Sequence, residues 1–224
     1  MRATNLKKSF KQFSLDINSL EIPQQICGLI GGNGCGKTTT INILAGLTKP
    51  DSGEISHNFR TQEITLVPQK PYMMRDTVLA NLLYPLKLHK IAPDAAKIEE
   101  LLHLANLQDL RNAHAPSLSA GESQKLALIR ALIFEPKIIF LDEIFSNMDM
   151  ESQTAFEQYI LQQQNKNPIT WVIISHQLSA IKRLCSHIIY MEKGRIVEEG
   201  GDILQYPQTA GLQKFLEFNY TPQP

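Results

Sequence analysis

Several features that define other classes of protein are missing from this chain of 224 residues. Its cysteines, Cys27, Cys35 and Cys185, are odd in number and scattered, so neither a disulfide framework nor a zinc site is indicated. Its apolar runs have the length of a strand, far too short to cross a bilayer. No signal peptide is evident, so we expect a cytosolic protein with reduced thiols. Any membrane role would have to come through a partner chain.

An excess of charge of one sign is missing as well. The chain has 22 basic and 22 acidic residues and a formal net charge of zero. Proteins that bind DNA or RNA usually carry a basic excess or a basic stripe. We therefore expect no nucleic acid partner.

Short apolar runs, by contrast, recur along the chain and alternate with helical patterns. Buried strands are expected at Ile26–Ile30, Ile64–Val67, Ile138–Leu141, Ile169–Ile174 and Ile188–Met191. Helices are expected at Lys37–Leu47, Glu151–Gln164 and Leu178–Leu184. Strands that alternate with helices predict an α/β fold with a mostly parallel sheet, covered by helices on both faces.

Two parts of the chain depart from this alternation. Residues 6–22 and 53–57 are typical of short antiparallel strands, which predicts an N-terminal antiparallel β part. Asp76–Phe134 has helical spacing without a convincing strand, and Asp76 and Asp94 are candidate helix N-caps. We expect a single domain with a core at 1–70 and 136–205, an inserted helical subdomain at 71–135, and a C-terminal helix and tail at 206–224.

One segment matches the phosphate-binding pattern GxxxxGK[ST] in full, between an expected strand and an expected helix. Glycines let successive backbone N–H groups turn toward a phosphate. The Lys37 ammonium would reach the β and γ oxygens of a nucleotide, and the Thr38 hydroxyl would bind Mg²⁺. The alternative is a glycine-rich turn that matches by chance, which the flanking strand and helix disfavour. The expected nucleotide-binding residues here are Gly31, Gly32, Asn33, Gly34, Cys35, Gly36, Lys37, Thr38 and Thr39.

A second acidic site follows the expected strand Ile138–Leu141. Asp142 ends this strand and would support the Mg²⁺ shell. Glu143 would project toward the γ-phosphate and polarise the attacking water as a general base. Taken alone, this pair could equally cap the end of a strand. Together with the phosphate loop it predicts a P-loop NTPase core.

The order of further motifs resembles the ATP-binding cassette (ABC) family over nearly the whole chain. Leu118–Glu122, with the sequence LSAGE, is similar to the family signature LSGGQ. Ser119 and Gly121 would begin a helix whose hydroxyl, free N–H groups and dipole face an anion. The alternative is an ordinary capped helix. Ala120 and Glu122 depart from the commonest signature, which raises the question of a tighter or slower site.

The resemblance implies roles for other residues. Gln69 corresponds to the glutamine that links Mg²⁺ and the attacking water to the helical subdomain, and His176 to the histidine that contacts the γ-phosphate. Ser146–Asp149 corresponds to a segment at the dimer interface. For stacking on adenine the pattern favours Phe10, with Phe13 as a close rival.

The resemblance also implies the cofactors and partners. ATP and Mg²⁺ would bind, with Thr38, Gln69 and Asp142 at the metal. Two copies, or this chain and a homologous cassette, would form a head-to-tail dimer in which Ser119 and Gly121 complete the partner's site. The chain would lie on the cytoplasmic face of a prokaryotic cell membrane, bound to integral permease subunits, with a solute-binding protein as a further candidate partner.

Smaller features bear on the transport hypothesis. Residues 71–74, Pro-Tyr-Met-Met, suit the gripping of a permease helix, or else they pack the core of the helical subdomain. Arg75–Leu88 is similar to the matching segment of tungstate or molybdate importers. Cys35 lies in the phosphate loop, where N–H groups and Lys37 would favour a thiolate; a small residue filling a small space is the simpler interpretation.

Other functions remain as alternatives. A soluble cassette ATPase of repair or translation usually carries long coiled coils or two fused cassettes, and this chain has neither. An exporter motor is a further possibility. A P-loop kinase or GTPase would leave Leu118–Glu122, Gln69 and His176 unexplained, and a regulator without turnover is disfavoured by Glu143.

Overall fold

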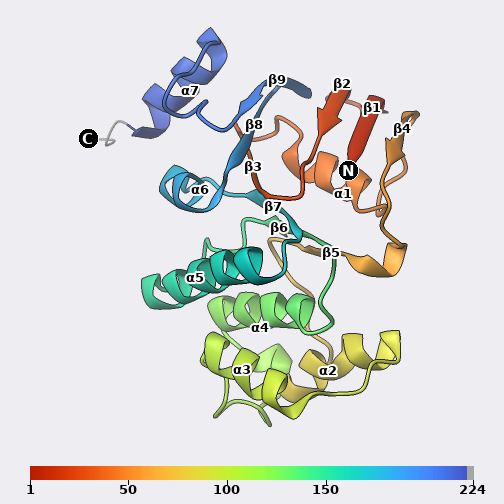
Figure 1. Cartoon of the computed structure of the whole chain (residues 1–224), viewed down its shortest axis with the longest axis vertical. Helices are drawn as coiled ribbons and strands as arrows, with labels where there is room; N and C mark the ends of the chain where they lie inside the picture. The colour runs from red at the N-terminus through yellow and green to blue at the C-terminus, as the bar shows by residue number, and fades with distance from the viewer. Residues whose placement is uncertain (221–224) are drawn as a thin grey trace.

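The computed structural model describes residues 1–220 and contains two sheets (Figure 1). The larger has six strands in the order β5-β6-β7-β3-β8-β9. All neighbours are parallel except the β8–β9 pair. Its strands are β3 (Ile26–Gly31), β5 (Ile64–Val67), β6 (Ile138–Asp142), β7 (Thr170–Ile174), β8 (His187–Glu192) and β9 (Arg195–Gly200).

The central strands of this sheet are buried on both faces. Every residue of β3, β6 and β7 is buried, as expected for parallel strands with helices on both sides. Successive side chains point to opposite faces. In β6, for example, Ile139 and Leu141 pack into one core and Ile138 and Phe140 into the other. This confirms the α/β fold with a mostly parallel sheet.

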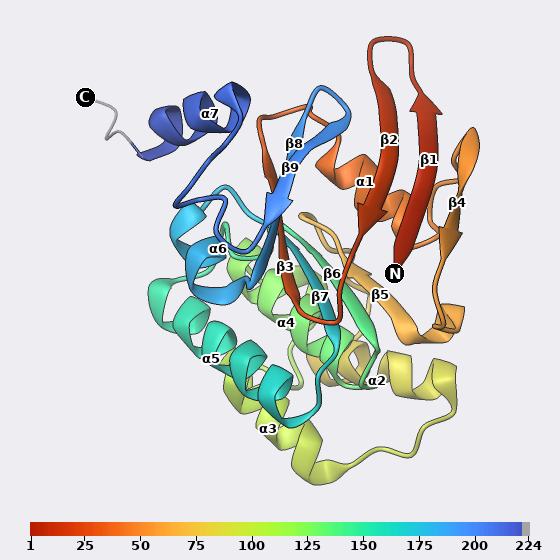
Figure 2. The ribbon, with the colours of Figure 1, turned by 45° about the horizontal axis from the view of Figure 1, so that its top comes forward.

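The smaller sheet is antiparallel, with the order β2-β1-β4. It consists of β1 (Arg2–Ser9), β2 (Ser14–Glu21) and β4 (Ser52–Ser56). Its buried residues Leu6 and Ile17 share a core with Ile41 of α1 (Lys37–Leu44) and Leu29 of β3. Figure 2 shows α1 between this sheet and the larger one. The expected N-terminal antiparallel part is therefore present.

The opposite face of the large sheet is covered by helices. Contacts join α2 to α4, α3 to α4 and α3 to α5, so the helices form a layered group (Figure 1). Within residues 1–220, no helix is long and apolar enough to cross a membrane. The remaining helices are α2 (Val78–His89), α3 (Ala95–Ala105), α4 (Ala120–Leu132), α5 (Met150–Lys166), α6 (Leu178–Leu184) and α7 (Ala210–Tyr220).

Several local predictions need correction. Asp76 does not cap α2; the Thr77 side chain does, accepting from the N–H of Ala80 at 3.0 Å. Asp94 caps α3 as expected, accepting from the N–H groups of Ala96 and Lys97. Helix α1 stops at Leu44 rather than Leu47, shortly before Gly46, whose φ of 76° leaves the helical region. Strand β9 was not predicted. The tail expected at 221–224 lies outside the described residues.

Candidate nucleotide-binding and hydrolysis site

The carboxyl ends of β3, β6 and β7 meet at one edge of the large sheet, where a cavity of about 470 Å³ opens. Ligands of open α/β sheets bind at this edge of the strands. The cavity collects most of the side chains predicted from the sequence, although they are far apart along the chain. Its lining is Phe10, Phe13, Asn33, Gly34, Gly36, Lys37, Thr38, Thr39, Gln69, Asp142, Glu143, Ile174 and His176.

The phosphate loop between β3 and α1 requires glycine at specific points. Gly36 has a φ of 110°, and a Cβ there would lie 2.7 Å from Cζ of Phe13. Gly31 has a φ of 149°, and a Cβ there would lie within contact distance of the backbone of Met191. These backbone angles are open to glycine but strained for L side chains. The loop leads directly into the N-terminus of α1, the end of a helix that attracts anions.

The lysine of the loop is held in place. Lys37 is only 8% exposed, and its Nζ donates hydrogen bonds to the carbonyl oxygens of Gly31 at 2.8 Å and Gly32 at 3.2 Å. Its ammonium is therefore partly desolvated, and its side chain bends back over the loop. A buried cation attracts an anion more strongly than a solvated one, because less water screens the interaction.

The Thr38 hydroxyl and the Asp142 carboxylate lie together. Thr38 Oγ1 donates to Asp142 Oδ2 at 2.8 Å. Burial raises the pKa of Asp142, and the Thr38 hydrogen bond and the Lys37 charge offset this only in part. A desolvated carboxylate beside a hydroxyl oxygen suits Mg²⁺, which prefers oxygen ligands and binds proteins through one or two carboxylates plus phosphates. No cluster of three or more His, Cys, Asp or Glu side chains competes for a metal within residues 1–220.

Glu143 has an unusual backbone and an unsatisfied oxygen. Its φ is 51°, and its own N–H donates to the Ile174 carbonyl at 3.0 Å. Its Oε2 accepts from the backbone N–H of His176 at 3.1 Å. His176 Nε2 lies 3.1 Å from Oε1, but without hydrogen-bond geometry, so this buried oxygen has no hydrogen-bond partner in the described chain. A buried, unpaired carboxylate oxygen facing a polar cavity is suited to accept a proton from water.

The predicted adenine-stacking residues lie side by side at this cavity. Phe10 and Phe13 stack with their ring centroids 6.2 Å apart, and both line it. Phe10 is 49% exposed, whereas the Phe13 ring packs against Gly36. An exposed ring face is free to stack on a base, which keeps Phe10 as the stronger candidate.

Ser119 and Gly121 do not reach the cavity; within residues 1–220 its lining contains neither. Ser119 instead caps the N-terminus of α4, where its side chain accepts from Glu122 N at 3.3 Å. In return Glu122 Oε2 accepts from Ser119 N at 2.8 Å. Glu122 therefore completes a capping box, a role that the glutamine of the common signature fills equally well. The start of α4 is exposed and lies outside the lining of the nucleotide cavity.

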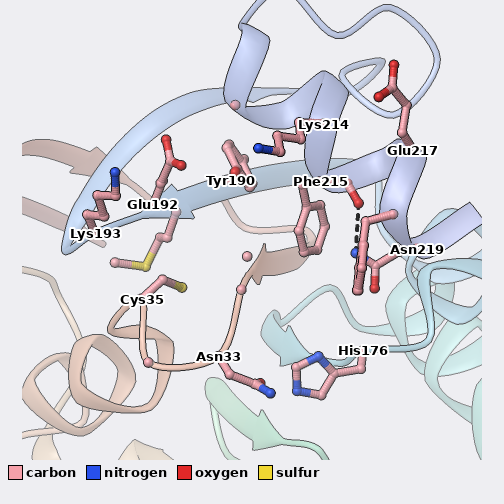
Figure 3. Close-up of a pocket in the computed structure, with 16 residues that line it drawn as sticks. Asn33, Cys35, His176, Tyr190, Glu192, Lys193, Lys214, Phe215, Glu217 and Asn219 are labelled. Atoms are coloured by element: carbon pink, nitrogen blue, oxygen red, sulfur yellow. Dashed lines mark hydrogen bonds between the residues drawn. The ribbon is translucent and has the colours of Figure 1, made fainter.

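The expectation of a Cys35 thiolate is wrong. Burial raises the pKa of this thiol, and the nearby Lys37 charge lowers it only in part. The side chain does not line the nucleotide cavity. It lies at a second cavity of about 910 Å³, which is also lined by Lys214 and Phe215 of α7 (Figure 3). Cys35 is therefore best understood as a small buried residue.

Sequence reasoning also missed Gln124, a buried residue of α4. Its side-chain amide bonds to the Gln69 carbonyl, to Ser146 and to the backbone N–H of Asn147. One available signal was a polar residue placed among the apolar positions of α4. That signal could not identify partners 55 and 22 positions away along the chain.

These features define a P-loop domain built to bind and hydrolyse a nucleoside triphosphate. A family model described as "ABC transporter" matches residues 10–146. The chain is 34% identical to the tungstate uptake ATP-binding protein TupC of Peptoclostridium acidaminophilum, covering 88% of this chain and 97% of that protein. It is 32% identical to a probable sulfate/thiosulfate import ATP-binding protein CysA of Chlorella vulgaris, covering 95% and 96%. This chain belongs to the ABC transporter family, as an ATP-binding, ATP-hydrolysing domain.

Other similarities agree with this assignment. The methionine import ATP-binding protein MetN of Pasteurella multocida is 31% identical, covering 94% of this chain and 67% of that protein. A solved ATP-binding subunit of an ABC transporter superposes with a TM-score of 0.83 at 22% identity, covering 98% and 99% of the two chains. A dimeric ATP-binding cassette bound to ADP and Pi superposes with a TM-score of 0.79 at 24% identity. These two structures establish the fold.

Proposed function

We propose that two copies of this chain clamp ATP head to tail and that hydrolysis drives the import of a solute through permease subunits in the membrane. The observation that carries this proposal is the divided site. The nucleotide cavity has its phosphate loop, acidic pair and histidine, whereas Ser119 lies outside it on an exposed helix start. A second copy would supply that end of α4. The solved cassette that is dimeric with ADP and Pi supports this arrangement.

Each residue then has a distinct part in hydrolysis. The N–H groups of the phosphate loop and Lys37 bind the β and γ phosphates. Glu143 Oε1 accepts a proton from the attacking water, because it is a carboxylate oxygen that makes no hydrogen bond within residues 1–220. His176, with its side chain 51% exposed beside Glu143, contacts the γ-phosphate. Phe10 stacks on the base, and the partner's Ser119 and Gly121 contact the γ-phosphate from the other side.

Thr38 and Asp142 are the side chains that would hold Mg²⁺, with Gln69 at the edge of the same cavity. When bound, Mg²⁺ would neutralise charge on the β and γ phosphates. The residues that this chain brings together fit the ion, because they offer a desolvated carboxylate and a hydroxyl 2.8 Å apart.

The exposed aromatic and apolar side chains near α2 support a membrane partner. Tyr72 is 74% exposed and Leu88 is 65% exposed. Arg130 holds this segment by donating from its Nη2 to the Tyr72 carbonyl at 3.0 Å. Met73 packs against the main core instead. Residues 71–74 therefore include both a packed side chain, Met73, and an exposed one, Tyr72. Tyr72 is the side chain that a permease helix would meet.

We further propose a tetrahedral oxyanion as the solute. Two relatives that match this chain over nearly their whole length are named for tungstate and for sulfate or thiosulfate. The methionine relative extends further beyond the match. The cassette has no contact with the solute, so the proposal rests on these relatives alone.

Uptake by cells that lack this chain tests the proposal. Complementation with the wild type should restore accumulation of tungstate, measured by mass spectrometry of washed cells. Lys37→Ala should not restore it. Tyr72→Arg should also fail, while the purified variant keeps its ATP binding.

Three outcomes would revise this account. Methionine uptake that depends on the chain, with tungstate uptake unchanged, would overturn the oxyanion but keep the importer. No uptake defect for any solute, with the chain absent from the membrane fraction, would overturn the importer. Loss of ATP binding in Tyr72→Arg would show that residues 71–74 pack the helical layer rather than contact a permease.

A further inference from the structure

Gln124 is a polar side chain inside the helical layer, only 1% exposed. Its Nε2 donates to the Gln69 carbonyl at 3.2 Å and to Ser146 Oγ at 3.4 Å. Its Oε1 accepts from the backbone N–H of Asn147 at 3.2 Å. Burying an amide is costly unless its groups are hydrogen-bonded. One side chain of α4 thus joins two loops that are distant from it in the sequence.

Both loops carry residues of the hydrolysis site. Gln69 lines the nucleotide cavity. Ser146 belongs to the turn that begins at Glu143: its Oγ donates to the Glu143 carbonyl at 2.9 Å, and its N–H donates to the same oxygen at 3.2 Å. The Gln124 amide is therefore one hydrogen-bonded residue away from the Glu143 backbone.

The Glu143 backbone depends on such support. A φ of 51° is uncommon for a residue other than glycine, asparagine or aspartate, and it costs free energy that the surroundings must offset. The Ser146 hydrogen bonds close the turn behind this residue. Gln124 fixes Ser146 and Asn147 in turn, so it restrains the direction of the Glu143 carboxylate without touching it.

We propose that Gln124 is a positioning residue for ATP hydrolysis. Its single buried amide holds Gln69 and Glu143 in position beside the nucleotide. This inference rests on the proposed roles of Gln69 and Glu143. The same amide lies near the start of α4, where a Cβ on Gly121 would lie 2.5 Å from the Asn147 carbonyl. A displacement of the start of α4 would therefore disturb both loops together.

Two substitutions separate the polar role from the packing role. Gln124→Met keeps a similar shape and removes all three hydrogen bonds. Gln124→Glu keeps the acceptor for Asn147 and replaces the two N–H donors of the amide by at most one O–H donor. We expect kcat to fall about tenfold or more in both, because a misplacement of about 1 Å can cost on the order of 10²-fold in rate. KM for ATP and the Kd of a fluorescent ATP analogue should stay within about twofold, since Lys37 and Thr38 are unaffected.

A control and a double variant complete the test. Gln162→Met places the same change on the exposed face of α5 and should leave kcat unaltered. Ser146→Ala breaks the other end of the same connection and should lower kcat in the same way. If the two residues act through one path, the double variant Gln124→Met with Ser146→Ala should lose little more than the stronger single variant.

Three results would overturn the proposal. Wild-type kcat in Gln124→Met or Gln124→Glu would show that the donors do not position the site. A parallel rise in KM and Kd with a fall in Tm would show a purely structural role. If the kcat losses of the two single variants multiply in the double variant, Gln124 and Ser146 act independently. Should Gln124→Met fail to fold, Gln124→Glu and Ser146→Ala decide the question, and turnover in Glu143→Gln tests the proposed function separately.

Discussion

The edge of the large sheet and the start of α4 are the two regions to which we assign anion binding, and they are built in different ways. At the sheet edge, Lys37 and Asp142 are buried and bonded within their own chain. At the start of α4, Ser119 is exposed, and its side chain accepts the capping hydrogen bond from Glu122 N. The first region lines the nucleotide cavity, whereas the second does not. In the proposed function, a single chain therefore holds the nucleotide, and the start of α4 from a second copy completes the site.

Glu143→Gln should give the largest effect, because it separates ATP hydrolysis from ATP-dependent dimerisation. It keeps the shape and removes the proton acceptor, so we expect kcat to fall about 10³-fold, within the usual range for a general base. ATP binding should persist, and the variant should elute as an ATP-dependent dimer in size-exclusion chromatography with light scattering. A variant that stays monomeric with saturating Mg-ATP would contradict a site shared between two copies, because the start of α4 would then have no partner. ADP in place of ATP serves as the control.

The backbone of the phosphate loop gives the next largest effect. Gly36→Ala introduces a Cβ where φ is 110° and where Phe13 Cζ would be 2.7 Å away. We expect the affinity for ATP to fall by roughly 5- to 150-fold, because strain of this kind costs on the order of 1–3 kcal/mol. Isothermal titration calorimetry measures this loss. Gly46→Ala is the control, since it lies outside the phosphate loop at a φ of 76° and its added Cβ meets no atom within 4 Å; an equal loss of affinity in both would refute a cause local to Gly36.

The aromatic pair at the cavity mouth should have an intermediate effect. Phe10→Ala removes an exposed ring and should weaken ATP binding about tenfold, as expected for one stacked base. Phe10→Trp should retain affinity. Phe13→Ala should lower Tm more than affinity, because its ring packs against Gly36. The reverse order of affinity losses would assign the base to Phe13.

Much of this architecture could be predicted because its signals are local. The apolar strands and the phosphate loop are contiguous in sequence, and the order of the motifs indicated that distant residues meet. Strand β9 was missed because no residue of Arg195–Gly200 is fully buried, so its apolar signal is weak. The thiol of Cys35 was misjudged because the turn of the loop, invisible in the sequence, points it to the second cavity. Gln124 was missed because its partners are set by tertiary packing.

The smallest predicted effect concerns the capping box of α4. Hydrogen bonds from Ser119 hold the pKa of Glu122 below its ordinary value of 4.5. A lowered pKa stabilises the fold above pH 4.5, and this contribution is lost as the pH falls through the lower value. Glu122→Gln should therefore lower Tm slightly at pH 7, and the difference from the wild type should disappear as the pH falls. Thermal unfolding from pH 7 to 3.5 measures both, and an unaltered slope in Glu122→Gln would contradict the assignment.

Mixing two inactive variants tests most directly whether the two regions act between molecules. Lys37→Ala destroys the nucleotide cavity and spares the start of α4. Ser119→Asp keeps an N-cap residue but places a negative charge where the γ-phosphate would lie. In a mixed dimer, one site combines an intact cavity with an intact helix start. We predict that each variant alone hydrolyses almost no ATP and that an equimolar mixture regains activity; activity in the mixture no greater than the average of the two would contradict a site shared between two copies.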